Sequence, residues 1–511
     1  MGTEKKPARR GGRRQRRSDR TAVTLSALPA LKRKIPEYEI LSADQLEAVH
    51  DASMRILEET GIDFRDDEAL QMWRAAGAEV QGQRVRLDRA LLMALVAQAP
   101  PQFTLHGRNP ERSVPLGGRY TIFAPNYGSP YVRDLDDRRR YSTLEDLQNF
   151  HKLAYLAPVL HVTGGITCEP VDIPIPKRHL HTMFSVLRYS DKPFMGSVTS
   201  GERAEDSIAM ARIVFGGDYL DSHTVMVSVV NCNSPLVWDA TMLDALKVYA
   251  RNNQAVITAP FVMAGASTPA STVGAVAQLN AEALAGVAFG QVVRAGSPMV
   301  YGNFLATVSM KSGAPMGGTP EISQMNFIIG QLARRYRLPW RSSGMVCGSK
   351  LFDAQAAYES NMTMSAVLLS GANYIFHSAG WNEAGLSANF AKFMLDCEQT
   401  EMFYKLGQGI TLDGLEESIA DLGQIGPGGH FLGTDYTREN FRSAFYMPEY
   451  LDNNSFDQWQ SEGALDANTR GLTAARRALE TYEAPPMDPA VEEELRAFIA
   501  KREAVLPEGV E

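Results

Sequence analysis

Most residues of this sequence that could do chemistry follow short apolar runs, and few of them are charged. Asn231 ends the run TVMVSVVN, Phe261 ends AVITAPF, and Tyr301 lies in SPMVYGN. His377 ends ANYIFHS, and Trp381 follows in the next loop. Aromatic faces attract a cation that cannot be hydrogen-bonded, such as a quaternary ammonium, and each desolvated contact contributes about 0.5–2 kcal/mol. These rings indicate a cation-binding pocket, with ordinary core packing as the alternative.

The histidines do not have the pattern of a metal site. A metal hydrolase needs two or three His, Asp or Glu ligands at strand ends, and His377 is the only one of the nine histidines that ends a predicted strand. His179 and His181 lie two residues apart in a helical pattern, so their side chains diverge. The sequence has no GxSxG or Walker A motif. We therefore predict no protein-bound metal and no catalytic side chain, only positioning and desolvation.

The glycine-rich segment IGPGGHFLG, residues 425–433, is the best candidate for an anion-binding loop. Glycines free the backbone to aim N–H groups at an anion, and barrels often bind phosphate near their last two strands. The residues that would form the loop are Gly426, Gly428, Gly429 and His430. The alternative is a tight turn whose glycines serve only close packing.

The elements that must position these residues form a repeating pattern of apolar runs and helical stretches. Crossovers of a dozen or more residues between the runs demand parallel strand pairing. Eight such units fit a closed (β/α)8 barrel, an α/β fold of the TIM-barrel type, better than an open doubly wound sheet. Its active site is then expected at the carboxyl ends of the strands. The predicted strands are 159–165, 193–198, 224–231, 255–261, 297–303, 338–345, 372–378 and 421–426.

Four regions follow from this pattern. Residues 1–35 are predicted to form a basic, disordered arm, because residues 1–20 hold nine Lys and Arg against two acidic residues. Residues 36–155 are predicted to form an N-terminal helical cap that includes a pocket segment. The barrel is expected over residues 156–485. A C-terminal helix and tail occupy residues 486–511.

The composition is that of a folded protein without membrane spans. The chain has 511 residues, of which 44% are hydrophobic and 22% charged, and it has no run of about 18 uninterrupted apolar residues. Four widely spaced cysteines point to a reducing, cytoplasmic environment and against a disulfide scaffold. The charged stretch 132–141 is predicted to be a hairpin tip. The net charge of −8 combines a tail of +7 with a body of −15.

Several long segments of the chain resemble the trimethylamine methyltransferase family, the corrinoid-dependent methyltransferases. The likeness is carried by SGMVCGSKLFDAQAAYES (343–360), GANYIFHSAGWNEAGLSANFAKFMLDCE (371–398) and IGPGGHFLGTDYTREN (425–440). PNYGSPYV (125–132) also resembles the amino-terminal pocket segment of the family. The resemblance extends from about residue 40 to about residue 485 and leaves the basic arm outside.

The resemblance implies a (β/α)8 barrel that passes an amine methyl group to the Co(I) of a corrinoid, a cobalamin-type cofactor carried by a separate partner protein. The sequence lacks pyrrolysine, so it is similar to the branch typified by glycine betaine methyltransferases. A quaternary amine leaves as a neutral tertiary amine, and no general acid is required. We also expect a homo-oligomer, without a membrane or nucleic-acid partner.

The resemblance assigns roles to three of the aromatic candidates. Tyr127 is expected to pack against the ammonium group, and Trp381 to add a second aromatic wall. His377 is expected to hydrogen-bond a substrate carboxylate. Phe261, Asn231 and Tyr301 complete the predicted substrate pocket. The glycine loop is expected to anchor a carboxylate or to shape the face on which the corrinoid protein docks.

Two other functions stay open at this point. The first is a barrel lyase or isomerase that binds a small phosphorylated substrate through residues 425–430, although no catalytic Lys or His/Glu pair ends a predicted strand. The second is a non-catalytic protein that uses its basic arm on nucleic acid.

Overall fold

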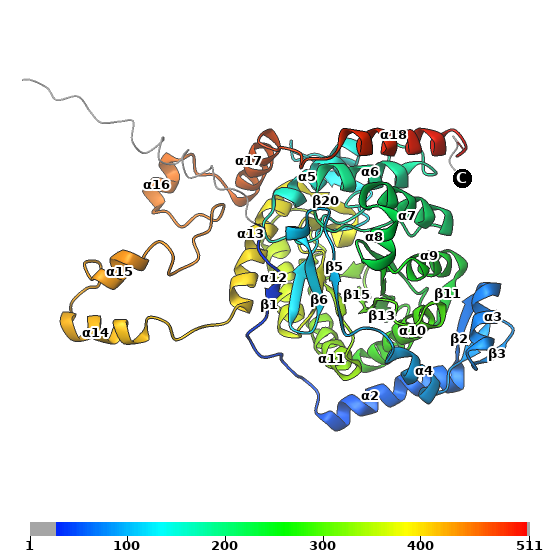
Figure 1. Cartoon of the computed structure of the whole chain (residues 1–511). Coiled ribbons are helices and arrows are strands. Elements are labelled where there is room, and N and C mark those ends of the chain that lie inside the picture. The colour runs from blue at the N-terminus through cyan, green and yellow to red at the C-terminus, as the bar shows by residue number, and fades with distance from the viewer. Residues whose placement is uncertain (1–26, 508–511) are drawn as a thin grey trace, which may run out of the picture.

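A barrel of parallel strands forms the centre of the molecule (Figure 1), in a computed structural model that describes residues 27–507. Six regular strands follow one another in the order β10-β12-β14-β17-β18-β7, each parallel to the next. They are β7 (Tyr120–Phe123), β10 (Val227–Val230), β12 (Ala255–Thr258), β14 (Met299–Gly302), β17 (Trp340–Ser343) and β18 (Tyr374–Phe376).

Two short extended segments close the barrel between β7 and β10, which confirms the predicted (β/α)8 fold class. Backbone hydrogen bonds hold these segments in the positions of two further strands. The bonds run from His161 to Phe123 (2.9 Å), from Thr163 to Pro193 (2.9 Å) and from Val227 to Phe194 (3.1 Å).

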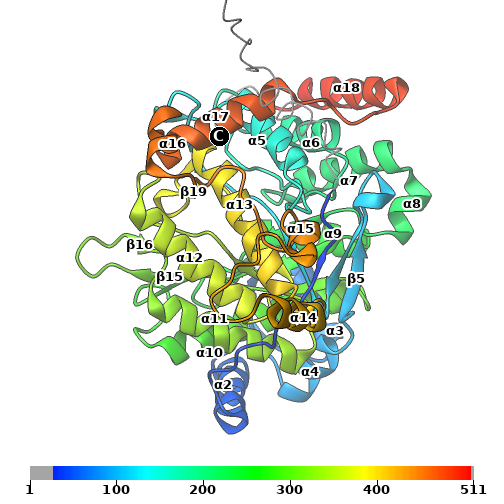
Figure 2. The same cartoon turned by 90° about the vertical axis from the view of Figure 1, so that its left-hand side faces the viewer.

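Helices cover the outside of the barrel, and their apolar faces pack on the outward-facing strand residues. Figure 2 shows α11, α12 and α13 on one wall. The 22-residue helix α10 is the one helix of residues 27–507 that is long and apolar enough to cross a membrane, and most of it is buried in the core. The barrel helices are α5 (Leu144–Leu156), α6 (Arg178–Tyr189), α7 (Gly201–Phe215), α8 (Gly217–Ser222), α9 (Ala240–Arg251), α10 (Thr272–Val293), α11 (Pro320–Tyr336), α12 (Ala354–Leu369) and α13 (Phe390–Gly407).

The N-terminal region is a mixed α/β layer, whereas the sequence analysis predicted a helical cap. Strands β2 to β4 join β11 in a small sheet, and the β5–β6 hairpin adds apolar side chains to the amino end of the barrel interior. The elements are β1 (Leu31–Lys32), α2 (Ala43–Arg55), the π-turn Ile56–Thr60, β2 (Ile62–Arg65), α3 (Asp67–Ala75), β3 (Glu79–Gln81), β4 (Arg84–Arg86), α4 (Arg89–Val96), β5 (Gln102–Leu105), β6 (Val114–Gly117) and β11 (Val237–Asp239).

The described end of the predicted basic arm is ordered. Residues 1–26 lie outside the described part, but Leu31–Lys32 pair with β7, and Leu31 and Arg33 are 1% and 3% exposed. The prediction of a disordered arm is therefore wrong for residues 27–35. The apolar run LPAL in residues 28–31 has enough hydrophobic surface to stay packed on the barrel.

The eighth predicted strand, 421–426, is wrong, because those residues belong to helix α14 (Leu415–Ile425) and the turn after it. The missing strand is β7, which pairs with β18 and lies in the segment assigned to the cap. Its sequence YTIF is a typical buried strand, but prolines and glycines surround it. The barrel therefore begins near Tyr120, and its last helix ends at Gly407.

The region after α13 leaves the barrel and returns to it. Figure 1 shows α14 and α15 away from the body, with α17 back beside it. Helix α17 packs on α13, and α18 lies across α6 and α7. These elements are α15 (Asp435–Asn440), α16 (Phe456–Ser461), α17 (Ala467–Glu480) and α18 (Pro489–Glu503).

A four-stranded sheet, β19-β20-β8-β9, lies beside the carboxyl ends of the barrel strands. The predicted hairpin at 132–141 is confirmed as β8–β9. Three short elements next to the mouth complete the upper layer, namely β13, β15 and β16. The bounds are β8 (Tyr131–Arg133), β9 (Arg139–Tyr141), β13 (Phe261–Ala264), β15 (Phe304–Val308), β16 (Pro315–Met316), β19 (Trp381–Asn382) and β20 (Ser387–Asn389).

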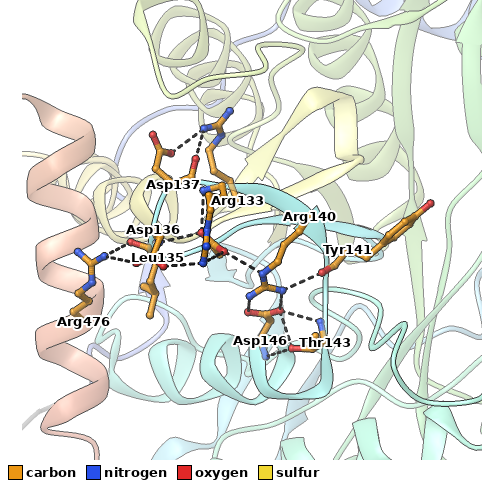
Figure 3. Close-up of polar contacts among 11 residues, drawn as sticks. Arg133, Leu135, Asp136, Asp137, Arg140, Tyr141, Thr143, Asp146 and Arg476 are labelled. Atoms are coloured by element: carbon orange, nitrogen blue, oxygen red, sulfur yellow. Dashed lines mark hydrogen bonds and ion pairs between the residues drawn. The ribbon is translucent and has the colours of Figure 1, made fainter.

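Ion pairs fix the β8–β9 hairpin to the helices below it (Figure 3). Arg140 donates to both carboxylate oxygens of Asp146 on α5, at 2.6 and 2.9 Å, and to Asp134 at 3.0 Å. Both carboxylates are nearly buried, with 6% of each side chain exposed. On the other side Arg476 of α17 reaches Asp136 at 3.1 Å. The sheet that carries Trp381 is thus tied to α5 and α17.

Replacing Arg140 with Ala should lower the free energy of unfolding by about 2 kcal/mol, because Asp146 loses its ion-pair partner and Asp134 loses one of two. Urea unfolding curves measure the effect. Arg138→Ala is the matched control, since Arg138 is 71% exposed in the same hairpin and its ion pairs contribute at most about 0.5 kcal/mol. If both variants lost the same free energy of unfolding, a specific structural role for Arg140 would be contradicted.

Candidate active site

A continuous group of aromatic rings lies at the carboxyl ends of β12, β14 and β18. His377 is its centre, with ring centroids 4.4 Å from Phe376, 4.2 Å from Trp381 and 5.5 Å from Phe304. Phe304 and Trp381 are 5.6 Å apart. Tyr127 approaches Phe376 at 5.5 Å from one side, and Phe261 approaches Phe304 at 5.0 Å from the other. The structure therefore brings Tyr127, Phe261, His377 and Trp381 together as predicted.

The alternation of side chains along the strands decides which residues reach the barrel interior. On β18, Tyr374 and Phe376 belong to the interior apolar cluster, together with Val300 of β14. Tyr301 follows Val300 in β14, so its side chain points to the opposite face of the strand, toward the helices. There its hydroxyl donates to Asn280 Oδ1 of α10 at 2.8 Å. The prediction of Tyr301 as a pocket residue is therefore not supported by its position. Asn231 follows β10 and is exposed at the mouth.

His377 is held in an unusual backbone conformation, with φ at 54°. This left-handed region is costly for most residues and persists only where the surroundings require it. Its Nδ1 lies 3.0 Å from Ser343 Oγ of β17, and its Nε2 makes no hydrogen bond with any described residue of 27–507. Burial, together with the nearby charge of Arg341, lowers the pKa of His377 well below its usual value. The imidazole is therefore neutral at pH 7.

Beneath this group lies a buried guanidinium that the sequence analysis did not identify. Arg341 of β17 is 1% exposed, and its Cζ lies 5.0 Å from the centroid of Phe376. It donates through Nη1 to the Asn303 carbonyl, while its Nε is buried without a partner. Within residues 27–507 no carboxylate pairs with it, and burial lowers its pKa to about 9. An unpaired cation at this depth is costly unless an anion reaches it.

A buried ion pair positions the loop that carries His377 and Trp381. Lys392 and Asp396 of α13 are 2.6 Å apart, with 0% and 3% of their side chains exposed. Asp396 also accepts the Gly380 amide at 2.9 Å. Cys347 Sγ lies 3.2 Å from the Trp381 carbonyl. Because these contacts are intramolecular, the rings are in place before any ligand binds, which lowers the cost of ordering them.

The predicted anion loop does not join this site. Gly426, Gly428, Gly429 and His430 follow helix α14 and not a barrel strand. They are partly or fully exposed in a segment that projects from the body (Figure 1). Phosphate binding at the barrel mouth through this loop is therefore not supported by its position.

Two signals in the sequence would have identified the missed residues. Arg341 stands in LPWRSSGM, a strand otherwise apolar or small, and a charged residue in a strand buried on both faces needs a specific partner. Phe376 shares the parity of Tyr374, two residues before it. Neither signal identifies a ligand; the structure is what shows that the cation and the aromatic face lie in one layer of the barrel.

The arrangement can bind a small zwitterion without acid–base chemistry. The rings form a neutral wall suited to a permanent cation. Arg341 offers donors for an anion at its other end, and His377 adds one in the tautomer that carries its proton on Nε2. Among residues 27–507 no group of three His, Cys, Asp or Glu side chains could hold a metal ion. Glu169 lies on the Tyr127 side, where it pairs with Arg178 at 3.6 Å, and burial raises its pKa.

Comparisons with known proteins agree with this geometry. The chain is 42% identical over 469 residues to the glycine betaine methyltransferase of Desulfitobacterium hafniense, which covers 92% of this chain and 98% of that protein. It is 27% identical to the proline betaine:corrinoid methyltransferase of Eubacterium limosum over 81% of this chain and 87% of that protein.

More distant relatives share the fold. The chain is 26% identical to the trimethylamine methyltransferase MttB of Methanosarcina barkeri, over 91% of this chain and 95% of that protein. The crystal structure of the monomethylamine methyltransferase MtmB of Methanosarcina barkeri superimposes with a TM-score of 0.53 at 12% identity, over 88% of this chain and 90% of that one.

The family model described as trimethylamine methyltransferase matches residues 9–507. Its members are named as methyltransferases, which excludes the alternative of a lyase or isomerase for this enzyme. The confirmed resemblance also agrees with the barrel and with the arrangement of the mouth. The chain belongs to the trimethylamine methyltransferase family and is a methyltransferase.

Proposed function

We propose that this enzyme removes a methyl group from glycine betaine or a closely related carboxylated quaternary amine, and transfers it to a corrinoid carried by a partner protein. The observation that carries the proposal is the pairing of a neutral aromatic mouth with an unpaired, buried guanidinium. A betaine has a permanent cation at one end and a carboxylate at the other, and both ends find their complement here. The glycine betaine and proline betaine methyltransferases among the relatives support this substrate class.

The ammonium group would rest against Tyr127, Phe304 and Trp381. Each ring face contributes about 0.5–2 kcal/mol in a desolvated pocket. The neutral state of His377 matters here, because an imidazolium next to the same rings would repel the substrate. The carboxylate would reach toward Arg341 and His377 Nε2, which have free donors on that side.

The proposed chemistry needs no side chain that acts as an acid or a base. The carbon–nitrogen bond breaks with its electron pair on nitrogen, so a neutral tertiary amine leaves and needs no proton. A reduced corrinoid on the partner protein supplies the nucleophile. The residues of this chain hold the methyl group in a fixed direction and exclude water, which can provide a large share of the rate enhancement.

The proposal is tested by mixing the enzyme with a reduced corrinoid protein, or with free reduced cobalamin, and separate methylated amines. We expect dimethylglycine to appear from glycine betaine, as measured by mass spectrometry. Choline and trimethylamine are the controls, because the first lacks the carboxylate and the second also lacks the permanent charge. Turnover of trimethylamine but not of any betaine would overturn the proposal.

Replacing Arg341 with Gln should raise KM for glycine betaine by about 30-fold to 1,000-fold, the effect of losing a buried charge-assisted contact of 2–4 kcal/mol. Binding of tetramethylammonium, which has no carboxylate, should stay within about threefold. Arg337→Gln is the matched control, since Arg337 lies four residues earlier and is exposed. If the Arg341 variant bound glycine betaine and tetramethylammonium equally weakly, Arg341 would stabilise the barrel and not bind the carboxylate.

Replacing His377 with Asn should lower kcat/KM for glycine betaine by about 10-fold while leaving the melting temperature almost unchanged. Asn tolerates the left-handed backbone and can keep the contact to Ser343, but it has no counterpart of Nε2. His377→Ala adds the backbone strain and should also lower the melting temperature. Because the pKa of His377 is well below its usual value, kcat/KM of the native enzyme should not change with its ionisation above pH 6.5. Full activity of the Asn variant would exclude a role for Nε2.

A further inference from the structure

Residues 409–445 project from the outer wall of the barrel (Figure 1). We call this segment the arm; it is distinct from the basic N-terminal residues 1–35. The arm contains α14 and α15, and no residue of either helix is buried. The sequence analysis placed a barrel strand at 421–426 and did not anticipate this segment.

The arm exposes more apolar surface than an isolated segment can stabilise. Leu415, Ile419 and Leu422 form one stripe of α14, with 50%, 56% and 52% of each residue exposed. An amphipathic helix of 11 residues is marginal in water unless its apolar face packs on something. Further exposed side chains line the same arm, namely Ile410 (92%), Leu412 (78%), Phe431 (38%), Leu432 (82%), Phe441 (58%) and Phe445 (79%).

The arm leaves the body at the end of α13 and returns to the same helix. At the start, the Gly407 carbonyl accepts the Lys34 amide at 2.9 Å. After the arm, Glu398 accepts the backbone amides of Tyr450 and Leu451, each at 2.8 Å. Tyr446 also donates to Glu401 at 3.2 Å. The arm is thus presented outward at a defined place on the wall.

The wall beside the arm presents a matching apolar surface. On α12, Tyr358 and Met362 are 75% and 44% exposed, and on α13, Met402 and Leu406 are 40% and 55% exposed. Each pair has the i, i+4 spacing that places two side chains on one helix face. We call these four residues the α12–α13 face.

We propose that the arm of one chain packs on the α12–α13 face of a second copy of this chain, and that the two copies exchange arms about a twofold axis. The arm begins beside its own face, so one twofold axis next to α13 places each arm on the other copy and closes the assembly. The three phenylalanines are 38%, 58% and 79% exposed. At roughly 150–250 Å² for a whole aromatic side chain, they would bury about 260–440 Å², a third to a half of the roughly 800 Å² per partner in a standard interface.

Charge and position favour a second copy over the methyl-accepting protein. The arm has six acidic residues and two arginines, while four arginines and one glutamate line a cavity of about 380 Å³ at the far end of α12. These arginines are Arg33, Arg119, Arg334 and Arg337. The arm also begins at the amino end of the barrel, where Lys34 follows β1 and β1 pairs with the first residues of β7. A methyl acceptor must approach the opposite end.

The test measures the mass of the full chain in sedimentation velocity over a range of concentrations. We expect the native chain to sediment at twice 56.1 kDa or more, and Ile419→Asp with Leu422→Asp to weaken the association by at least about 100-fold. Gln424→Asp adds a charge on the opposite face of α14 and should leave the mass unchanged. Circular dichroism verifies that each variant is folded.

A photo-crosslinker at Leu415, in a mixture of ¹⁴N- and ¹⁵N-labelled chains, identifies the surface that the arm contacts. Mixed-isotope crosslinks to residues 354–369 or 390–407 support the proposal. A monomeric native chain, a double variant with native mass, or crosslinks only within one chain would overturn it. So would a double variant that keeps its mass but loses methyl transfer only when the acceptor is a corrinoid protein, because the arm would then bind that protein.

Discussion

The energetic constraint behind the site is the burial of the Arg341 guanidinium in the interior of the barrel. An isolated charge in such surroundings is strongly unfavourable, and even its pKa is lowered to about 9 by burial. The barrel tolerates this charge with one backbone carbonyl and one aromatic face as partners. The free energy that the apolar core of a large barrel supplies is what makes such a local cost possible. A bound carboxylate would relieve it, so the cost in the free enzyme favours binding of an anion.

The surrounding residues are consistent with that constraint. A positive charge at Arg341 requires its neighbours to be neutral, and His377 is neutral because burial and the guanidinium both disfavour its protonated form. The same neutrality suits a substrate with a permanent positive charge at the mouth. The Lys392–Asp396 pair then serves a separate task, because it fixes the Gly380 amide and with it the loop that presents the rings. The paired charges of Lys392 and Asp396 thus fix the backbone, whereas the unpaired charge of Arg341 lies where a ligand is expected.

The sequence predicted the fold class well and the site in part. Seven of the predicted strands lie in the barrel because their β-branched and apolar composition is distinctive, while YTIF was missed among prolines and glycines. Tyr301 was misplaced for a physical reason: a parallel strand buried on both faces carries no alternation of polarity, so the parity of its side chains cannot be read from sequence. Phe261, His377 and Trp381 were found because they follow the strand ends, whereas Phe376, which lies within β18, was missed. Arg341 was missed because a residue within a strand was not considered as a ligand.

The arm begins at the end of the barrel opposite the mouth, which separates the proposed self-association from the proposed methyl transfer. The proposed methyl transfer would require a mouth that a methyl-accepting protein can reach and that excludes water around a small donor. A self-association surface at the mouth would compete with that acceptor. The arm begins at the opposite end, beside β1, and projects from the outer wall with its apolar side chains exposed. An exchange of arms there would stabilise the barrel through α12 and α13, which also carry the loop around Gly380, without covering the rings. Assembly would therefore use the outer surface of α12 and α13 and leave the mouth of the barrel free for catalysis.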